Sequence, residues 1–161
     1  MLPGSPALRN LTVVLRTAMA NRPVIQGFPY LAESLRRAGV RTNTWWLPAM
    51  QSRYETELGP VVIQDTPLFQ GMAEVPPFDS AGLVAALRAD QAGQTTFPQF
   101  AEAAWRAGVV RWVVALDDRT CTYFGRDDET YVEEYAAVTI SETPLTEDEL
   151  EPLEASHQKA R

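Results

Sequence analysis

The chain has 161 residues, of which 45% are hydrophobic, and a net charge of −7, so it has enough apolar material for a compact domain. Its longest apolar runs are about five residues, whereas a membrane-spanning helix needs roughly 20. The N-terminus lacks a signal-peptide pattern, and the single cysteine excludes an internal disulfide, so we expect a cytoplasmic protein with no membrane segment. The negative net charge disfavours nucleic acid as a partner.

The first expected element is a helix that begins after Ser5-Pro6 and has apolar residues at the spacing of one helical face. A second helix should begin at Phe28-Pro29, where proline is tolerated in the first turn, and end at Gly39. Three runs of strand-forming residues follow, at about 41–47, 50–56 and 60–64.

The next elements repeat this order. After a linker over 65–78, expected to be an ordered loop, one helix should follow the cap candidate Asp79, and another should begin at Phe97-Pro98 and end at Gly108. Strands are expected at 110–116, 120–125 and 130–135. The remaining residues, 141–161, form an acidic tail with a candidate helix after Thr146.

The order recurs because the sequence itself is duplicated. Segments 28–40 and 97–109 are identical at eight of 13 positions with an offset of 69, where random matching would give about one. Segments 11–20 and 83–92 are identical at four of ten positions once a three-residue difference in the connecting loop is allowed. A repeat on this scale predicts one supersecondary unit used twice.

We therefore predict an α+β fold, a tandem duplication of a helix-helix-β-hairpin unit within a single domain over 1–140. Unit 1 covers about 6–68 and unit 2 about 79–140. Each unit is too small to bury much surface alone, so the two should pack about a pseudo-twofold axis into one antiparallel sheet with helices on one face. The chain would then be an internal pseudo-dimer, as a monomer or a homodimer.

Several strings in both halves resemble one known family. They are Thr96-Phe-Pro-Gln-Phe100, Arg106-Ala-Gly-Val-Val-Arg111, Thr122-Tyr-Phe-Gly125, Tyr131-Val-Glu-Glu-Tyr135 and Asn43-Thr-Trp-Trp-Leu-Pro48 with Gln51, Ser52 and Tyr54. In order and spacing they resemble the YbcV-like family over about 7–140, with Ala136 where that family is expected to have proline. The resemblance implies a domain of unknown function, sometimes labelled a phage envelope protein, and it implies no catalytic residues.

The side chains that most catalysis requires are absent from the body of the chain. The only histidine, His157, and the only lysine, Lys159, lie in the acidic tail. The body therefore lacks a Ser-His-Asp set, a Cys-His pair, a histidine metal site and a Schiff-base lysine. We assign no catalytic residue, no metal site and no cofactor, and an enzyme is the less favoured class.

Two acidic residues recur in both units, which would fit paired catalytic carboxylates. Glu33 and Glu102 each lie four residues before an arginine, Arg37 or Arg106, in the order that stabilises a helix surface. A surface ion pair therefore explains the recurrence without chemistry.

Three acidic clusters, 117–118, 127–129 and 133–134, lie near predicted turns and would fit a hard cation, but turns favour Asp in any case. No calcium-loop spacing is present, so solvated turns are the preferred interpretation. Cys121 has no histidine or lysine near it in sequence and is interpreted as a core residue.

The two copies differ most in their first hairpins. Unit 2 has Trp112, Val113, Cys121 and Phe124 where unit 1 has Asn43, Thr44, Ser52 and Glu55. A polar and aromatic hairpin beside an apolar one is expected if one copy holds the core and the other contacts a ligand. The candidate ligand-binding residues are therefore Asn43, Trp46, Gln51, Arg53 and Tyr54. The alternative is that the sheet face of unit 1 is only more exposed.

Strand alternation constrains this candidate site. Leu47 should be core, which places Asn43 inward and Trp46 outward, so the five residues meet only if the strand bulges or twists. A narrower hypothesis uses Trp46 and Arg53 on one face, a pair suited to a planar or anionic ligand.

Three functions remain open at this point. The first is a binding or accessory protein, for which the resemblance implies a phage link. It would act on a small molecule or a protein through a groove between the units or through the unit 1 hairpin. The second is a carboxylate- or tyrosine-dependent enzyme acting on a small ligand. The third is an acidic inhibitor of a basic partner protein that uses the tail. The thin catalytic inventory favours the first.

Overall fold

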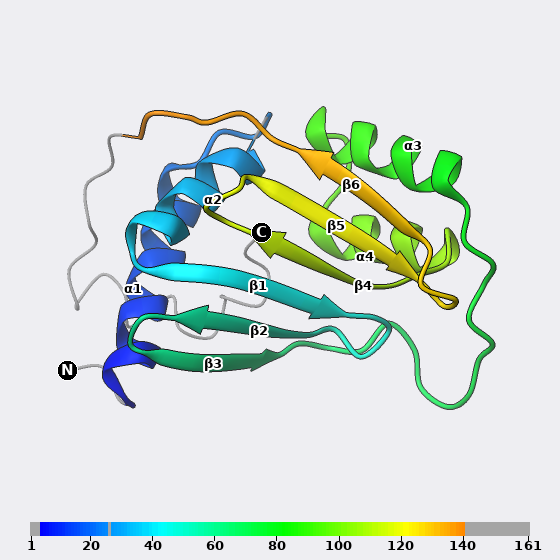
Figure 1. Ribbon diagram of the computed structural model, residues 1–161, viewed down its shortest axis with the longest axis horizontal. Coiled ribbons are helices and arrows are strands. Elements are labelled where there is room, and N and C mark those ends of the chain that lie inside the picture. Colours follow the sequence, from blue (N-terminus) through cyan, green and yellow to red (C-terminus); the bar gives the residue numbers. More distant parts are fainter. Residues whose placement is uncertain (1–3, 26, 141–161) are drawn as a thin grey trace.

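The structure, a computed structural model, describes residues 4–25 and 27–140, and the candidate helix after Thr146 lies outside them. It consists of two helix-helix-hairpin units, each with two helices followed by three strands (Figure 1). Unit 1 contains α1 (Pro6–Asn21), α2 (Gly27–Arg37), β1 (Val40–Trp46), β2 (Gln51–Thr56) and β3 (Gly59–Gln64). Unit 2 contains α3 (Ser80–Gln91), α4 (Phe97–Arg106), β4 (Val109–Ala115), β5 (Thr120–Gly125) and β6 (Thr130–Glu134).

The six strands form one antiparallel sheet in the order β3-β2-β1-β4-β5-β6, so the units join through β1 and β4. The register of that pair has pseudo-twofold symmetry. Thr44 lies opposite Val113, its own counterpart at the offset of 69, and Trp45 lies opposite Trp112. The predicted α+β fold and the fusion of two units about a pseudo-twofold axis are therefore confirmed.

Special backbone features recur at the same offset. Gly39 and Gly108 follow α2 and α4 with φ of 91° and 87°, which confirms the predicted glycine helix ends. In each unit, a register shift follows this glycine at the start of the first strand. It lies between Val40 and Thr42 in unit 1 and between Val109 and Arg111 in unit 2. Downstream of the second helix, the offset of 69 fails at the third strand, because Ser52 pairs with Ile63 whereas Cys121 pairs with Glu133.

Side-chain caps mark the helix starts, and the cap at Asp79 is the one predicted from the sequence. The Ser5 side chain accepts a hydrogen bond from the Leu8 amide at the start of α1, and the Asp79 side chain accepts one from the Gly82 amide at the start of α3. Thr96 and Gln99 form a reciprocal capping box at the start of α4. These side chains satisfy amides that have no partner within the helix, and so determine where each helix begins.

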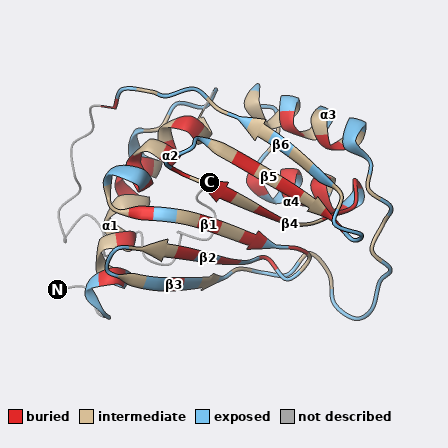
Figure 2. Cartoon of the chain, viewed as in Figure 1, coloured by how far each residue is buried: buried red, intermediate tan, exposed pale blue. Residues whose placement is uncertain are grey.

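The core lies between the helices and one face of the sheet, and buried side chains alternate along β1, β2, β4 and β5 (Figure 2). Its centre is aromatic and contains both units: Trp45 lies 4.8 Å from Phe97 and 6.0 Å from Trp112, between ring centroids. The matched pair Tyr54 and Tyr123 is buried at 4% and 5% exposure. The opposite sheet face, here the open face, carries exposed Trp46, Val62 and Val132. Across the described ranges, the structure has no helix with both the length and the hydropathy to cross a membrane.

Candidate functional site

The five residues proposed from sequence lie on two different faces of the sheet. Asn43 and Tyr54 are opposite each other in the β1–β2 register, and both are buried on the helix side. Gln51 and Arg53 are exposed on β2, and Trp46, opposite Gln51, is 38% exposed. The regular register keeps these five residues from converging on one concavity, as strand alternation anticipates.

The inward pair has structural partners. Asn43 accepts a hydrogen bond from the Trp45 indole nitrogen at 3.0 Å and donates one to the Arg53 carbonyl at 3.2 Å. These bonds fix the buried indole of Trp45 and the β1–β2 pair, because a buried polar group must be satisfied. On the open face, Arg53 pairs with Glu55, and Gln51 donates to Gln64 at 3.2 Å.

The two units differ in their interiors as well as in their hairpins. Within the described ranges, all buried polar or charged residues belong to unit 1, namely Arg16, Thr17, Ser34, Asn43 and Ser52. Their counterparts in unit 2 are Arg88, Ala89, Ala103, Trp112 and Cys121. Unit 2 therefore has the more apolar core, and its one charged counterpart, Arg88, is exposed.

A cavity of about 330 Å³ lies where unit 1 meets the helix side of unit 2, and we name it the inter-unit pocket. Unit 1 contributes Phe28 and Pro29, from the start of α2. The rest of the lining comes from α3, α4 and the β5–β6 hairpin, and from the residues that follow β6. The apolar part is formed by Leu87, Phe100, Cys121 and Tyr123 with Phe28 and Tyr135, and the charged part by Arg88, Asp90, Glu133 and Glu134.

A second cavity, of about 390 Å³, adjoins the first and shares Phe28 and Asp90 with it. Its lining comes from the α1–α2 connection (Met19 to Phe28) and the α3–α4 connection (Asp90 to Phe97), which are equivalent in the repeat. This cavity therefore lies where the two units face each other with matching segments, and we name it the axial pocket.

An ion pair borders the inter-unit pocket. Arg88 donates two hydrogen bonds to the Glu133 carboxylate, at 2.7 and 3.2 Å, and Tyr131 donates a third at 3.1 Å. Burial raises the pKa of Glu133, but the bonds from Arg88 and Tyr131 outweigh that effect, so its pKa lies below the ordinary value. Burial also raises the pKa of Tyr135 above its ordinary value, so its phenol stays neutral at physiological pH.

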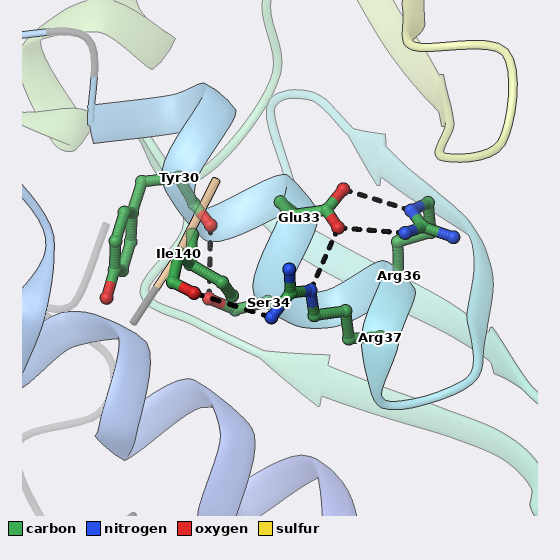
Figure 3. Close-up of polar contacts among 6 residues, drawn as sticks. All are labelled: Tyr30, Glu33, Ser34, Arg36, Arg37 and Ile140. Atoms are coloured by element: carbon green, nitrogen blue, oxygen red, sulfur yellow. Dashed lines mark hydrogen bonds and ion pairs between the residues drawn. The ribbon is translucent and has the colours of Figure 1, made fainter. Parts of the chain in front are cut away.

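The recurring carboxylates have the predicted structural role. Glu33 accepts hydrogen bonds from Arg36 at 3.0 and 2.8 Å and from Arg37 at 3.1 Å (Figure 3). In unit 2, Glu102 pairs with Arg106 at 2.7 Å. The Arg36 hydrogen bonds lower the pKa of Glu33, against the opposing effect of burial. Arg37 also approaches the Ile140 carbonyl at 3.5 Å, which links α2 to the segment that follows β6 (Figure 3).

Cys121 is 3% exposed, as predicted for a core residue, although its side chain also lines the inter-unit pocket. The described residues contain no group of three or more His, Cys, Asp or Glu that could hold a metal ion. The acids at 117–118 and 127–128 are exposed in turns, as expected for solvated positions.

The sequence interpretation missed the inter-unit pocket. Period-two alternation does place Tyr131, Glu133 and Tyr135 on one face, which is a usable signal. The proximity of Phe28 to Tyr135, with ring centroids 5.2 Å apart, is a contact between units that a local pattern does not reveal.

These features define a class of protein, a duplicated α+β chain with one antiparallel sheet and a pocket between its halves. The chain belongs to the family described as "Protein of unknown function (DUF1398)", whose model matches residues 17–134. It is 66% identical over 137 residues to "Uncharacterized protein Rv2012" of Mycobacterium tuberculosis and to "Uncharacterized protein Mb2035" of Mycobacterium bovis, and the match covers 85% of this chain and 84% of each relative. The YbcV name and the phage link stay predictions, because neither the family description nor these relatives carry them.

Proposed function

We propose that this protein binds a small molecule in the inter-unit pocket and acts as a binding or accessory protein. The observation that carries the proposal is the cavity of about 330 Å³ lined by both units. Small-molecule sites have volumes of about 300–1,000 Å³, apolar or aromatic walls and a few convergent polar groups. Phe28, Phe100 and Tyr123 give this pocket its aromatic walls, and Arg88 and Glu133 supply polar groups.

The duplication supports a specialised role for this region. Arg16 and Arg88 occupy equivalent positions in the first helices of the two units, yet Arg16 is buried and Arg88 is exposed beside the pocket. Ser52 and Cys121 are likewise equivalent, and Cys121 lines the pocket. The two copies have thus diverged at positions that form the pocket wall.

Cys121 provides a direct test because it is the only cysteine and lines the pocket. The rate of its modification by a thiol-specific reagent is measured with and without phenylacetate, phenylacetamide and phenethylamine, three small molecules that share one ring. We expect at least one of them to slow the modification in a saturable manner.

The matched control moves the thiol to the other face of the same strand. In the double variant Cys121→Ser/Thr122→Cys, residue 121 becomes serine, which is the residue that unit 1 has at the equivalent position. The new thiol at position 122 lies on the open face. A ligand in the inter-unit pocket should leave its modification rate unchanged. If no compound protects Cys121, or if both thiols are protected equally, the proposal is wrong.

A second candidate site is the open-face group of Trp46, Gln51 and Arg53. It is supported by the 38% exposure of Trp46 and by its position directly opposite Gln51. A large exposed indole near a guanidinium can stack on a planar ligand. Fluorescence titrations of the wild type, Trp46→Ala and Arg53→Ala with nucleotides and small acids test this site, and identical titrations would exclude it.

A further inference from the structure

The open face of the sheet carries an aromatic and cationic group of side chains outside the inter-unit pocket. We infer that Trp46, Arg111 and Phe124 bind a planar aromatic acid, whose ring stacks on the indole and whose carboxylate accepts hydrogen bonds from the guanidinium. The inference rests on the open-face candidate of the proposed function, with which it shares Trp46, and it gives the cationic role to Arg111 instead of Arg53. Three observations carry it: the strand register, the contacts of Arg111, and the residues at the equivalent positions of the repeat.

The three side chains lie next to one another in one row across the open face. Trp46 is opposite Arg111 in the β1–β4 register, and Arg111 is opposite Phe124 in the β4–β5 register. Neighbouring strands are about 4.8 Å apart, so one small aromatic molecule can reach both the indole and the guanidinium. The row crosses all six strands, and we name it the aromatic row: Gln64, Gln51, Trp46, Arg111, Phe124 and Thr130.

Arg111 is the charged residue of this row, and an aromatic ring holds it in place. Its Cζ atom lies 3.6 Å from the centroid of the Phe124 ring. Among the described residues, its guanidinium has no ion pair and no hydrogen bond, whereas Arg53 pairs with Glu55. A contact with a ring orients a guanidinium without using its N–H donors, so Arg111 can offer its planar fork to a carboxylate.

The repeat shows that the fold does not require these three groups. The pseudo-twofold axis relates the aromatic row to a second row that also crosses the sheet, here the equivalent row: Pro60, Glu55, Thr42, Ala115, Thr120 and Glu134. In the equivalent row, alanine stands in place of Trp46, threonine in place of Arg111 and glutamate in place of Phe124. The same pairing of strands therefore forms without an indole, a guanidinium or a phenyl ring, so sheet formation does not explain their presence.

The charges of the open face favour an anion beside Trp46. On the two strands that flank β1, the outward charged residues nearest to Trp46 in the register are Arg111 of β4 and Arg53 of β2. The carboxylates of Glu55 and Glu134 belong to the equivalent row, and the aromatic row has none. An acid stacked on Trp46 therefore has cationic neighbours, although the chain as a whole has a net charge of −7.

Three probes separate the role of the charge from the role of the ring. β-Naphthoate is a planar aromatic acid, β-naphthamide is its uncharged analogue, and octanoate is an acid without a ring. We expect β-naphthoate to shift the indole N–H signal of Trp46, assigned with Trp46→Phe, in a saturable NMR titration. The other two probes should bind at least about fivefold more weakly in calorimetric titrations, because each lacks one of the two interactions.

Two substitutions of Arg111 test its assigned role. Arg111→Gln removes the charge and should weaken β-naphthoate binding about three- to tenfold, the usual scale for a partly exposed charged hydrogen bond. Arg111→Lys keeps the charge but has no planar fork, so it should also bind more weakly than the wild type. If the lysine variant binds as tightly as the wild type, the site recognises charge alone and the assigned geometry is wrong.

The control is Arg106→Gln, which removes the same charge from the surface of α4, where the Arg106 side chain is 76% exposed. It should leave β-naphthoate binding within about twofold of the wild type, because a distant surface charge acts only through a screened field. An equal loss in Arg106→Gln and Arg111→Gln would mean attraction to overall positive charge, and would overturn the inference. Binding of β-naphthamide as tight as that of β-naphthoate would overturn it as well.

The failure of this inference can be distinguished from the failure of the proposed function. Protection of Cys121 tests the inter-unit pocket, and no residue of the aromatic row lines that pocket. If Arg53→Ala weakens β-naphthoate binding and Arg111→Gln does not, the open-face candidate stands and the role of Arg111 is wrong. If β-naphthoate does not shift the Trp46 signal, the open-face site is wrong, and the inter-unit pocket is unaffected.

Discussion

Gly39 and Gly108 are equivalent in the repeat, yet the structure predicts very different costs for replacing them with alanine. Both have positive φ, so each substitution should lose roughly 1–2 kcal/mol from backbone strain. At Gly39 a new Cβ would lie 3.2 Å from the Glu57 carboxylate, the end of a flexible side chain that can move. At Gly108 it would lie 2.4 Å from the Pro77 carbonyl oxygen and 2.7 Å from the Phe78 Cα, both of which belong to the backbone.

The linker cannot easily move away from Gly108, because the Asp79 amide donates a hydrogen bond to the Ala107 carbonyl at 2.7 Å. Forced overpacking typically costs a further 1–3 kcal/mol, so Gly108→Ala should lose about 2–5 kcal/mol and Gly39→Ala about 1–2 kcal/mol. Urea unfolding of the two variants and the wild type, monitored by tryptophan fluorescence, measures the difference. Equal losses in the two variants would refute the argument, since they would show that the linker moves freely relative to the end of α4.

Three further predictions concern caps, charge and the tail. Thr96→Ala removes the α4 capping box and should lower the free energy of unfolding, measured in urea, by about 1 kcal/mol. Its control, Thr95→Ala, should cost far less, because it removes a hydroxyl with no hydrogen-bond partner in the described part of the chain. Because the pKa of Glu33 is lowered on folding, its contribution to stability is present above its ordinary value of 4.5 and is lost as pH falls through the folded value. Unfolding of Glu33→Gln should therefore depend less on acid pH than that of the wild type. A chain that ends at Ile140 should keep a cooperative thermal transition, and loss of that transition would show that 141–161 is part of the folded body.

Much of the fold could be predicted from the sequence, because the duplication makes two weak local patterns support each other. Pro29 with Gly39, and Pro98 with Gly108, mark the ends of the second helices, and the structure confirms both units in one antiparallel sheet. The strand boundaries were less accurate, since β1 and β4 each begin one residue before the predicted position. A strand end depends on pairing with a neighbour, which a single segment does not encode.

The candidate site could be predicted only in part. The alternation of side chains along a strand correctly places Trp46 on the outer face and Asn43 on the inner face. It thereby separates residues that the comparison of the two hairpins had placed in one candidate site. The inter-unit pocket could not be predicted, because it depends on Phe28 of unit 1 approaching Tyr135 of unit 2 across more than a hundred residues of sequence. Such a contact depends on how the two units pack against each other, and the local spacing of apolar and polar residues in the sequence does not predict it.

One NMR titration tests most directly the claim that a ligand binds between the two units. Each tryptophan gives a separate indole N–H signal, and two of them report on the two candidate sites. Trp112 packs 5.6 Å from both Phe100 and Tyr123 in the pocket wall, and Trp46 lies on the open face. When a compound that protects Cys121 is added to the full-length protein, the Trp112 signal should shift in a saturable manner while the Trp46 signal, assigned with Trp46→Phe, stays in place. A shift of Trp46 alone, or no shift of either signal, would contradict the inter-unit site.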